Sequence, residues 1–225
     1  MTPATAKVPD SAALERLGGA TLEIVHDLKN QLNGLKLYAT FLRKRLERED
    51  QPQDERETLA KLIAGLDRGA RDLSALVRYA RPLELHKQAG VNLQRIISNV
   101  ITEAAQRDTA GLPKIAIGLT FADDALIGEF DSAAMTEAIK SITDDVREAV
   151  SAKHAEPPSI IARRDAEAQA AIIEWQNAHL PMRSGALSHS CGTIHTEVAK
   201  KIIEDHGGEL TCEQNTIRVS LPLTN

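Results

Sequence analysis

Residues 24–33 read Ile-Val-His-Asp-Leu-Lys-Asn-Gln-Leu-Asn, and they lie in a proline-free stretch from Ala12 to about Glu49. Apolar residues recur there every three or four positions, which is the period of an amphipathic helix. Two series with a spacing of seven are apolar or Thr at eight of ten positions: Leu14, Thr21, Leu28, Leu35, Leu42 and Leu17, Ile24, Gln31, Tyr38, Arg45. The stripe is wider than a two-stranded coiled-coil seam, so it predicts a helix with more than one helical neighbour.

A second periodic segment runs from about Glu55 to Tyr79 and repeats the same spacing. Pro82 ends it, because proline cannot continue the helical hydrogen-bond ladder. Two long amphipathic helices joined by a short turn form a helical hairpin, and one hairpin leaves a wide apolar face uncovered. Packing two copies together would cover that face, so the pattern predicts a homodimer with a four-helix bundle.

The pattern changes after Pro82, where short alternating segments and helical segments follow each other. We expect helices at 94–107, 132–152 and 193–206, and strands at 115–121, 125–130, 159–162, 170–175, 209–213 and 216–222. The fold class predicted for the chain is therefore α+β. Its expected organisation is a flexible tail (1–11), the helical hairpin (12–84) and a second domain, an α/β sandwich (90–225).

Composition excludes several classes of function. Of the 225 residues, 27 are Lys or Arg and 32 are Asp or Glu, so a formal net charge of -5 gives no support to nucleic-acid binding. No apolar run is long enough to span a membrane, and the first residues lack the apolar stretch of a secretory signal. Two cysteines cannot build a disulfide framework, which favours reduced thiols. We therefore expect a cytoplasmic location.

His26 is the residue that carries chemistry in this reading. Helical spacing places it opposite the Leu28 and Leu35 seam, where it faces solvent, with Asp27 beside it and Asn30 one turn further along. A carboxylate next to an exposed imidazole fixes its tautomer and raises the basicity of the attacking nitrogen. An amide one turn away can position a water or a phosphoryl oxygen. Lys29 can offer a charge to that group, although a solvated lysine is the simpler interpretation.

The segment His-Asp-Leu-Lys-Asn-Gln-Leu-Asn-Gly-Leu at 26–35 resembles the phosphoacceptor box of two-component sensor histidine kinases. Further stretches are similar to other parts of the family, in the same order. Residues 79–83 resemble the exit of its dimerisation domain, and residues 91–93 resemble the opening of its ATP-binding domain. Residues 131–142 resemble the approach to its Asn-containing box, 200–208 the helix after its last glycine box, and 217–222 its closing strand. The resemblance covers residues 12 to 223. It implies that His26 is the phosphoacceptor and that residues 90–225 resemble a histidine kinase ATPase (Bergerat) domain.

Three positions depart from the nucleotide site that the resemblance implies. The Asn of the Asn-containing box aligns with Asp145, and the Asp that reads adenine aligns with Trp175, whose indole can donate but not accept a hydrogen bond. Gly192 alone remains of the last glycine box. Trp175 is expected to be a core residue that fills the vacated adenine pocket. We therefore expect a degenerate ATP site near Asp145, Trp175 and Gly192, with no cofactor bound by this chain.

A phosphoacceptor hairpin on a degenerate kinase-like domain is similar to the dimeric histidine phosphotransferases of phosphorelays. The resemblance implies that His26 exchanges a phosphoryl group with an aspartate of a response-regulator receiver domain, with Mg²⁺ on the receiver. An upstream hybrid kinase is a further possible partner. Three alternatives stay open: a kinase that uses ATP through altered contacts, a receiver phosphatase in which Asn30 positions the water, and a non-enzymatic dimeric module.

Metal binding is the remaining alternative. His189, Cys191 and His195 have a spacing that resembles a metal-ligand cluster, and His179 or Cys212 would have to supply a further ligand. Ordinary loop residues are the simpler interpretation of this segment, so no metal is expected.

Overall fold

The computed structural model describes residues 11–46, 53–81, 83–106, 116–122, 125–153, 156–180, 192–213 and 215–224. The chain divides into two compact units, Met1–Pro82 and Leu83–Asn225. The first contains a helical hairpin and the second contains helices and sheets, so the α+β class predicted from the sequence is confirmed.

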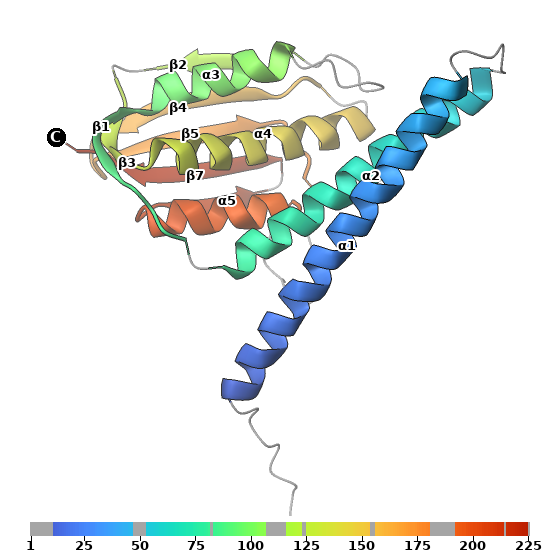
Figure 1. The fold of residues 1–225 in the computed structure, drawn as a ribbon. Coiled ribbons are helices and arrows are strands. Elements are labelled where there is room, and N and C mark those ends of the chain that lie inside the picture. Colours follow the sequence, from blue (N-terminus) through green and yellow to red (C-terminus); the bar gives the residue numbers. More distant parts are fainter. Residues whose placement is uncertain are drawn as a thin grey trace, which may run out of the picture. The chain divides into compact units, whose positions relative to one another are not determined.

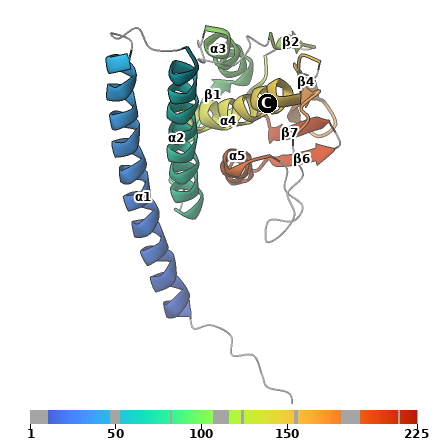
Figure 2. The ribbon, with the colours of Figure 1, turned by 90° about the vertical axis from the view of Figure 1, so that its right-hand side faces the viewer.

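The hairpin consists of α1 (Ser11–Leu46) and α2 (Gln53–Ala80), which overlap in the view of Figure 1 and run side by side in Figure 2. Ala39 of α1 packs with Leu59 and Ile63 of α2, and all three side chains are buried. Gly69 of α2 allows close approach, because a Cβ at this position would lie 3.2 Å from Leu32 Cδ1. Aliphatic packing with few rings therefore holds the hairpin together.

The wide apolar stripe that the sequence predicts on α1 divides into two rows in the structure. The row in contact with α2 contains Leu32, whose Cδ1 lies beside Gly69, and Ala39, which packs with Leu59 and Ile63. Val25, which is 6% exposed, lies on the same row by helical spacing. Leu28, Leu35 and Leu42 are 44%, 54% and 54% exposed in the single chain. α1 has two apolar stripes on neighbouring faces, and the hairpin covers only one of them.

The described residues of the second unit form two sheets and three helices. A two-stranded antiparallel sheet pairs β1 (Gln88–Asn92) with β3 (Ile127–Phe130). A five-stranded sheet has the order β2-β4-β5-β7-β6, with β2 and β4 parallel and the other pairs antiparallel. Its strands are β2 (Gly118–Phe121), β4 (Ser159–Asp165), β5 (Ala170–Gln176), β6 (Glu209–Glu213) and β7 (Thr216–Pro222).

The helices α3 (Leu93–Gln106), α4 (Ser132–Lys153) and α5 (Ile194–Asp205) lie on one face of the five-stranded sheet (Figure 2). Side chains of central strand β5 alternate between its two faces, as expected for a strand. Ile173 and Trp175 are fully buried, whereas Glu174 lies between Arg163 and Arg218, at 3.7 and 3.8 Å. The apolar core of this unit is therefore formed between the helices and the sheet.

Two structural observations concern the cysteines and the hydropathy of the helices. Cys212, on β6, is disulfide-bonded, whereas the cysteine count favoured reduced thiols. Among the described residues, no helix has both the length and the hydropathy that crossing a membrane requires.

A buried histidine joins the start of the second unit to its helices. His206 Nδ1 lies 2.7 Å from the Ile202 carbonyl and donates to it, because Nε2 accepts a 3.0 Å hydrogen bond from the Asp131 main-chain N–H. The Asp131 carboxylate caps α4 and accepts from His86 N at 2.8 Å. This arrangement requires a neutral His206 ring in a single tautomer.

We expect the second unit to lose stability as the pH falls through about 6.5. Burial lowers the pKa of His206 below its ordinary value, outweighing the hydrogen bond to Ile202, and the Lys87 charge lowers it further. The unfolded chain therefore binds a proton in a pH window where the folded chain does not. Stability rises with pH within this window, by at most about 1.4 kcal/mol per pH unit for one proton.

Denaturant unfolding followed by the fluorescence of the single tryptophan, Trp175, measures this effect in the second unit. The free energy of unfolding should rise less steeply between pH 5.5 and 7.5 in His206→Gln than in the native chain. Asp131 does not interfere with this measurement. Hydrogen bonds from the main chain of Ala134 and His86 lower the pKa of Asp131, so the stability that its carboxylate contributes is lost only in a separate, more acidic pH window. An equal slope in His206→Gln and the native chain would contradict the assignment to His206.

Candidate functional site

His26 lies in the middle of α1 with an accessible ring. Its side chain is 68% exposed and that of Asp27 is 72% exposed, with 3.7 Å between His26 Nδ1 and Asp27 Oδ1. Asn30 Nδ2 lies 3.4 Å from the same ring nitrogen, one helical turn away. Both neighbours therefore approach Nδ1. The Asn30 amide can donate to Nδ1 when this nitrogen carries no proton, whereas with the proton on Nδ1 the ring faces the Asp27 carboxylate and its lone pair is on Nε2.

The surroundings of His26 on α1 differ from one side to the other. Lys29 is half-buried and lies one helical turn from Val25, which is buried. Leu37 and Phe41 are 55% and 58% exposed, and helical spacing places them on the His26 side of the helix, three and four turns further along. The site thus combines an exposed imidazole, a carboxylate and an amide, with exposed apolar residues further along the same side of α1.

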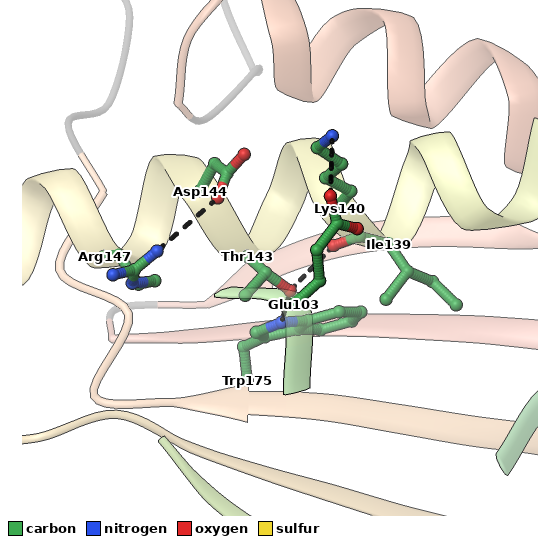
Figure 3. Close-up of polar contacts among 7 residues, drawn as sticks. All are labelled: Glu103, Ile139, Lys140, Thr143, Asp144, Arg147 and Trp175. Carbon is green, nitrogen blue, oxygen red and sulfur yellow. Dashed lines mark hydrogen bonds and ion pairs between the residues drawn. The ribbon is translucent and has the colours of Figure 1, made fainter. Parts of the chain in front are cut away.

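In the second unit, Trp175 stands at the position where the family resemblance implies an Asp that reads adenine. Its side chain is 1% exposed and lies between β5 and α4 (Figure 3). The indole N–H donates to Thr143 Oγ1 at 3.1 Å, and that hydroxyl donates to the Ile139 carbonyl at 2.7 Å. The ring and all its polar partners are satisfied within the protein, so this space is filled by core packing.

Asp145 lies on the same helix as Thr143 and is only 6% exposed. Its Oδ2 accepts from Thr193 Oγ1 at 2.7 Å, from Thr196 Oγ1 at 2.5 Å and from the Thr193 main-chain N–H at 3.3 Å. Thr193 is the N-cap of α5. A buried carboxylate of α4 is therefore hydrogen-bonded to the start of α5.

Gly192 precedes this cap with φ +82, a conformation that side chains rarely adopt. A Cβ at Gly192 would lie 3.0 Å from Leu180 Cδ1 and would collide with the Thr196 hydroxyl. The glycine is thus explained by local packing against Leu180 and Thr196.

The possible metal-ligand cluster falls partly outside the described residues, since His189 and Cys191 both lie there. His179, at φ 50, and His195, in the first turn of α5, are described. Within the described ranges, no group of three or more His, Cys, Asp or Glu side chains could hold a metal ion.

Sequence reasoning identified His26, Asp27, Asn30, Asp145, Trp175 and Gly192, and the structure places the first three together on α1. It missed Thr143, Thr193 and Thr196, which provide the polar partners of Trp175 and Asp145. Thr193 had one signal, because a Thr that precedes an apolar-periodic segment is a common helix N-cap. No sequence signal pointed to Thr143 or Thr196, since their side-chain partners are far away in the sequence.

Solved structures with a similar fold include full-length ShkA in complex with AMPPNP, the Acinetobacter baumannii histidine kinase AdeS, and the histidine kinase ThkA in complex with response regulator protein TrrA. Sequence identities are 12%, 12% and 16%, with TM-scores of 0.60, 0.52 and 0.55. The matches cover 92%, 84% and 97% of this chain, and 46%, 96% and 68% of the other chains. The chain therefore spans about half the length of ShkA.

No protein-family model and no curated protein matches the sequence. The structural likeness shows the fold: a helical hairpin followed by an ATPase-like α+β unit, as in histidine kinases. The chain is thus histidine-kinase-like in architecture.

Proposed function

We propose that the chain is a histidine phosphotransferase of a two-component phosphorelay, with His26 carrying the phosphoryl group. The observation that carries this proposal is the exposed His26 ring, approached at Nδ1 by Asp27 and Asn30, on the first helix of a histidine-kinase-like hairpin. The proposed setting is the cytoplasm, in signalling between an upstream kinase, such as a hybrid kinase, and a response regulator.

The chemistry requires little from this chain. A lone pair on His26 Nε2 attacks the phosphorus of an aspartyl phosphate on the receiver, the N–P bond forms, and the P–O bond breaks with its electron pair returning to the aspartate. The Asp27 carboxylate, 3.7 Å from Nδ1, stabilises the positive charge that develops on the ring. Reversal of the same step passes the group to a receiver. Mg²⁺ on the receiver would offset charge on the phosphoryl oxygens.

The second unit supports transfer without ATP. A purine would have to displace Trp175, which is fully buried and hydrogen-bonded to Thr143. Phosphates would have to displace the Asp145 carboxylate from Thr193 and Thr196. Both changes cost buried contacts and leave polar groups unpaired. We infer that this unit binds no nucleotide cofactor and serves instead in receiver docking.

The proposed partner is a receiver domain of a response regulator. ThkA, which has a similar fold, is described in complex with a response regulator protein. Leu37 and Phe41 offer apolar contact area on the His26 side of α1, three and four turns further along, for a partner that places its aspartate at the ring. Exposed apolar residues beside a reactive group are typical of a protein-binding surface.

We also propose that the active form is a homodimer. Leu28, Leu35 and Leu42 of α1 and Leu62 of α2 are about half exposed in the single chain. Helical spacing places the three α1 leucines on one side of that helix, opposite His26. A second copy would cover this face with the same residues and complete a four-helix bundle.

Two phosphoryl donors distinguish the candidate functions. We expect label on the chain after incubation with a phosphorylated receiver and none after incubation with labelled ATP and Mg²⁺. Label from ATP alone would contradict the phosphotransferase and indicate a kinase. Loss of label from the receiver with none on the chain would indicate a phosphatase, in which Asn30 positions the water. Unchanged receiver label would leave a non-enzymatic dimeric module.

A further inference from the structure

The N-terminus of α5 is occupied by carboxylates of the protein itself. The first N–H groups of a helix have no partner within the helix, and together with the helix dipole they favour a bound anion. The Oδ2 atom of Asp145 accepts hydrogen bonds from the main chain and hydroxyl of Thr193 and from the hydroxyl of Thr196. Glu197, in the first turn of α5, adds a second carboxylate that is only 7% exposed.

These contacts are incompatible with an external anion at the same place. A phosphate oxygen bound there would need the donors that Asp145 already uses. The displaced carboxylate would then be buried without partners beside a second negative charge, which is costly at low local dielectric. Glu197 would add to the repulsion.

We propose that Asp145 is a built-in anion that closes the N-terminus of α5 to phosphate ligands and holds the start of α5 on α4. The residue before the cap fits this role, since Gly192 passes so close to Thr196 that it has no room for a side chain. The closure makes this part of the fold independent of any ligand. It depends on contacts within residues 145–197 and is independent of phosphoryl transfer at His26.

Asp145→Ala and a matched control, Asp144→Ala, test the proposal in the full chain. Asp144 is the preceding residue on α4, and its 3.9 Å ion pair with Arg147 is partly exposed. We expect Asp145→Ala to lower the folding equilibrium constant of the second unit, followed by Trp175 fluorescence, by a factor on the order of 10 to 100. Asp144→Ala should lower it by no more than about fivefold.

Inorganic phosphate provides the second readout. At constant ionic strength set by chloride, added phosphate should raise the unfolding midpoint of Asp145→Ala, because the anion position is then open. The native chain and Asp144→Ala should show no such rise. Equal stabilisation of the native chain by phosphate, or no response in Asp145→Ala, would overturn the proposal.

Thr196→Val keeps the test decisive if Asp145→Ala fails to fold. This change preserves the side-chain shape and removes one donor to the carboxylate. We expect a loss on the order of tenfold in the folding equilibrium constant. A Thr196→Val chain as stable as the native chain would show that the carboxylate does not hold α5, and would overturn the proposal.

Discussion

His26→Gln abolishes acceptance of a phosphoryl group from a phosphorylated receiver, with an expected fall of at least about 10³-fold in the rate of labelling. The glutamine amide has no nucleophilic lone pair on nitrogen, while its polarity and length suit the same exposed position on α1. Because the His26 side chain is 68% exposed, the fold of the hairpin should be unaffected. The measurement is transfer of label from the receiver over time.

His86→Gln is the matched control for this experiment. His86 is also exposed, and its described hydrogen bond to Asp131 uses the main-chain N–H, which the substitution preserves. Its rate of labelling should equal that of the native chain. Labelling of His26→Gln at the native rate would remove His26 from the mechanism.

The second large effect is the loss of the proposed homodimer, which is tested by two substitutions on α1. Leu35 and Leu37 are 54% and 55% exposed, yet they point about 200° apart around α1. Leu35→Glu places a charge in the proposed dimer face of both copies, where burying an unpaired carboxylate costs several kcal/mol. We expect the dimer dissociation constant to rise by at least about 10³-fold.

Leu37→Glu changes the same residue type to the same charge on the His26 side. We expect it to remain dimeric and to slow exchange with the receiver. Sedimentation equilibrium across a concentration series measures the association of each variant. Equal weakening by both substitutions, or by neither, would contradict the assignment of the Leu28, Leu35 and Leu42 stripe to the dimer.

The sequence predicted the elements well because their periods are strong. The closing hairpin of β6 and β7 has the predicted bounds, and α1 and α2 begin and end within a few residues of the predicted positions. The sequence did not distinguish, within the wide apolar stripe of α1, the row that packs against α2. Val25, Leu32 and Ala39 form one apolar row and Leu28, Leu35 and Leu42 form another, and periodicity alone does not rank them.

In the candidate site, contacts between residues close in the sequence could be predicted, and contacts between distant residues could not. Asp27 and Asn30 were identifiable because helical spacing alone brings them to His26. The partners of Asp145 were not, since Thr193 and Thr196 lie 48 and 51 residues further along the chain. Trp175 was correctly predicted to be a core residue, but the hydrogen bond from its indole to Thr143 depends on how α4 packs on β5.

The most direct test of the central claim is to map the label after incubation of the native chain with a phosphorylated receiver. The account predicts an acid-labile, base-stable phosphoryl group on the peptide that contains His26, formed without ATP. A stable phosphoryl group elsewhere in the chain, or transfer to His26 from ATP in the absence of a receiver, would contradict it.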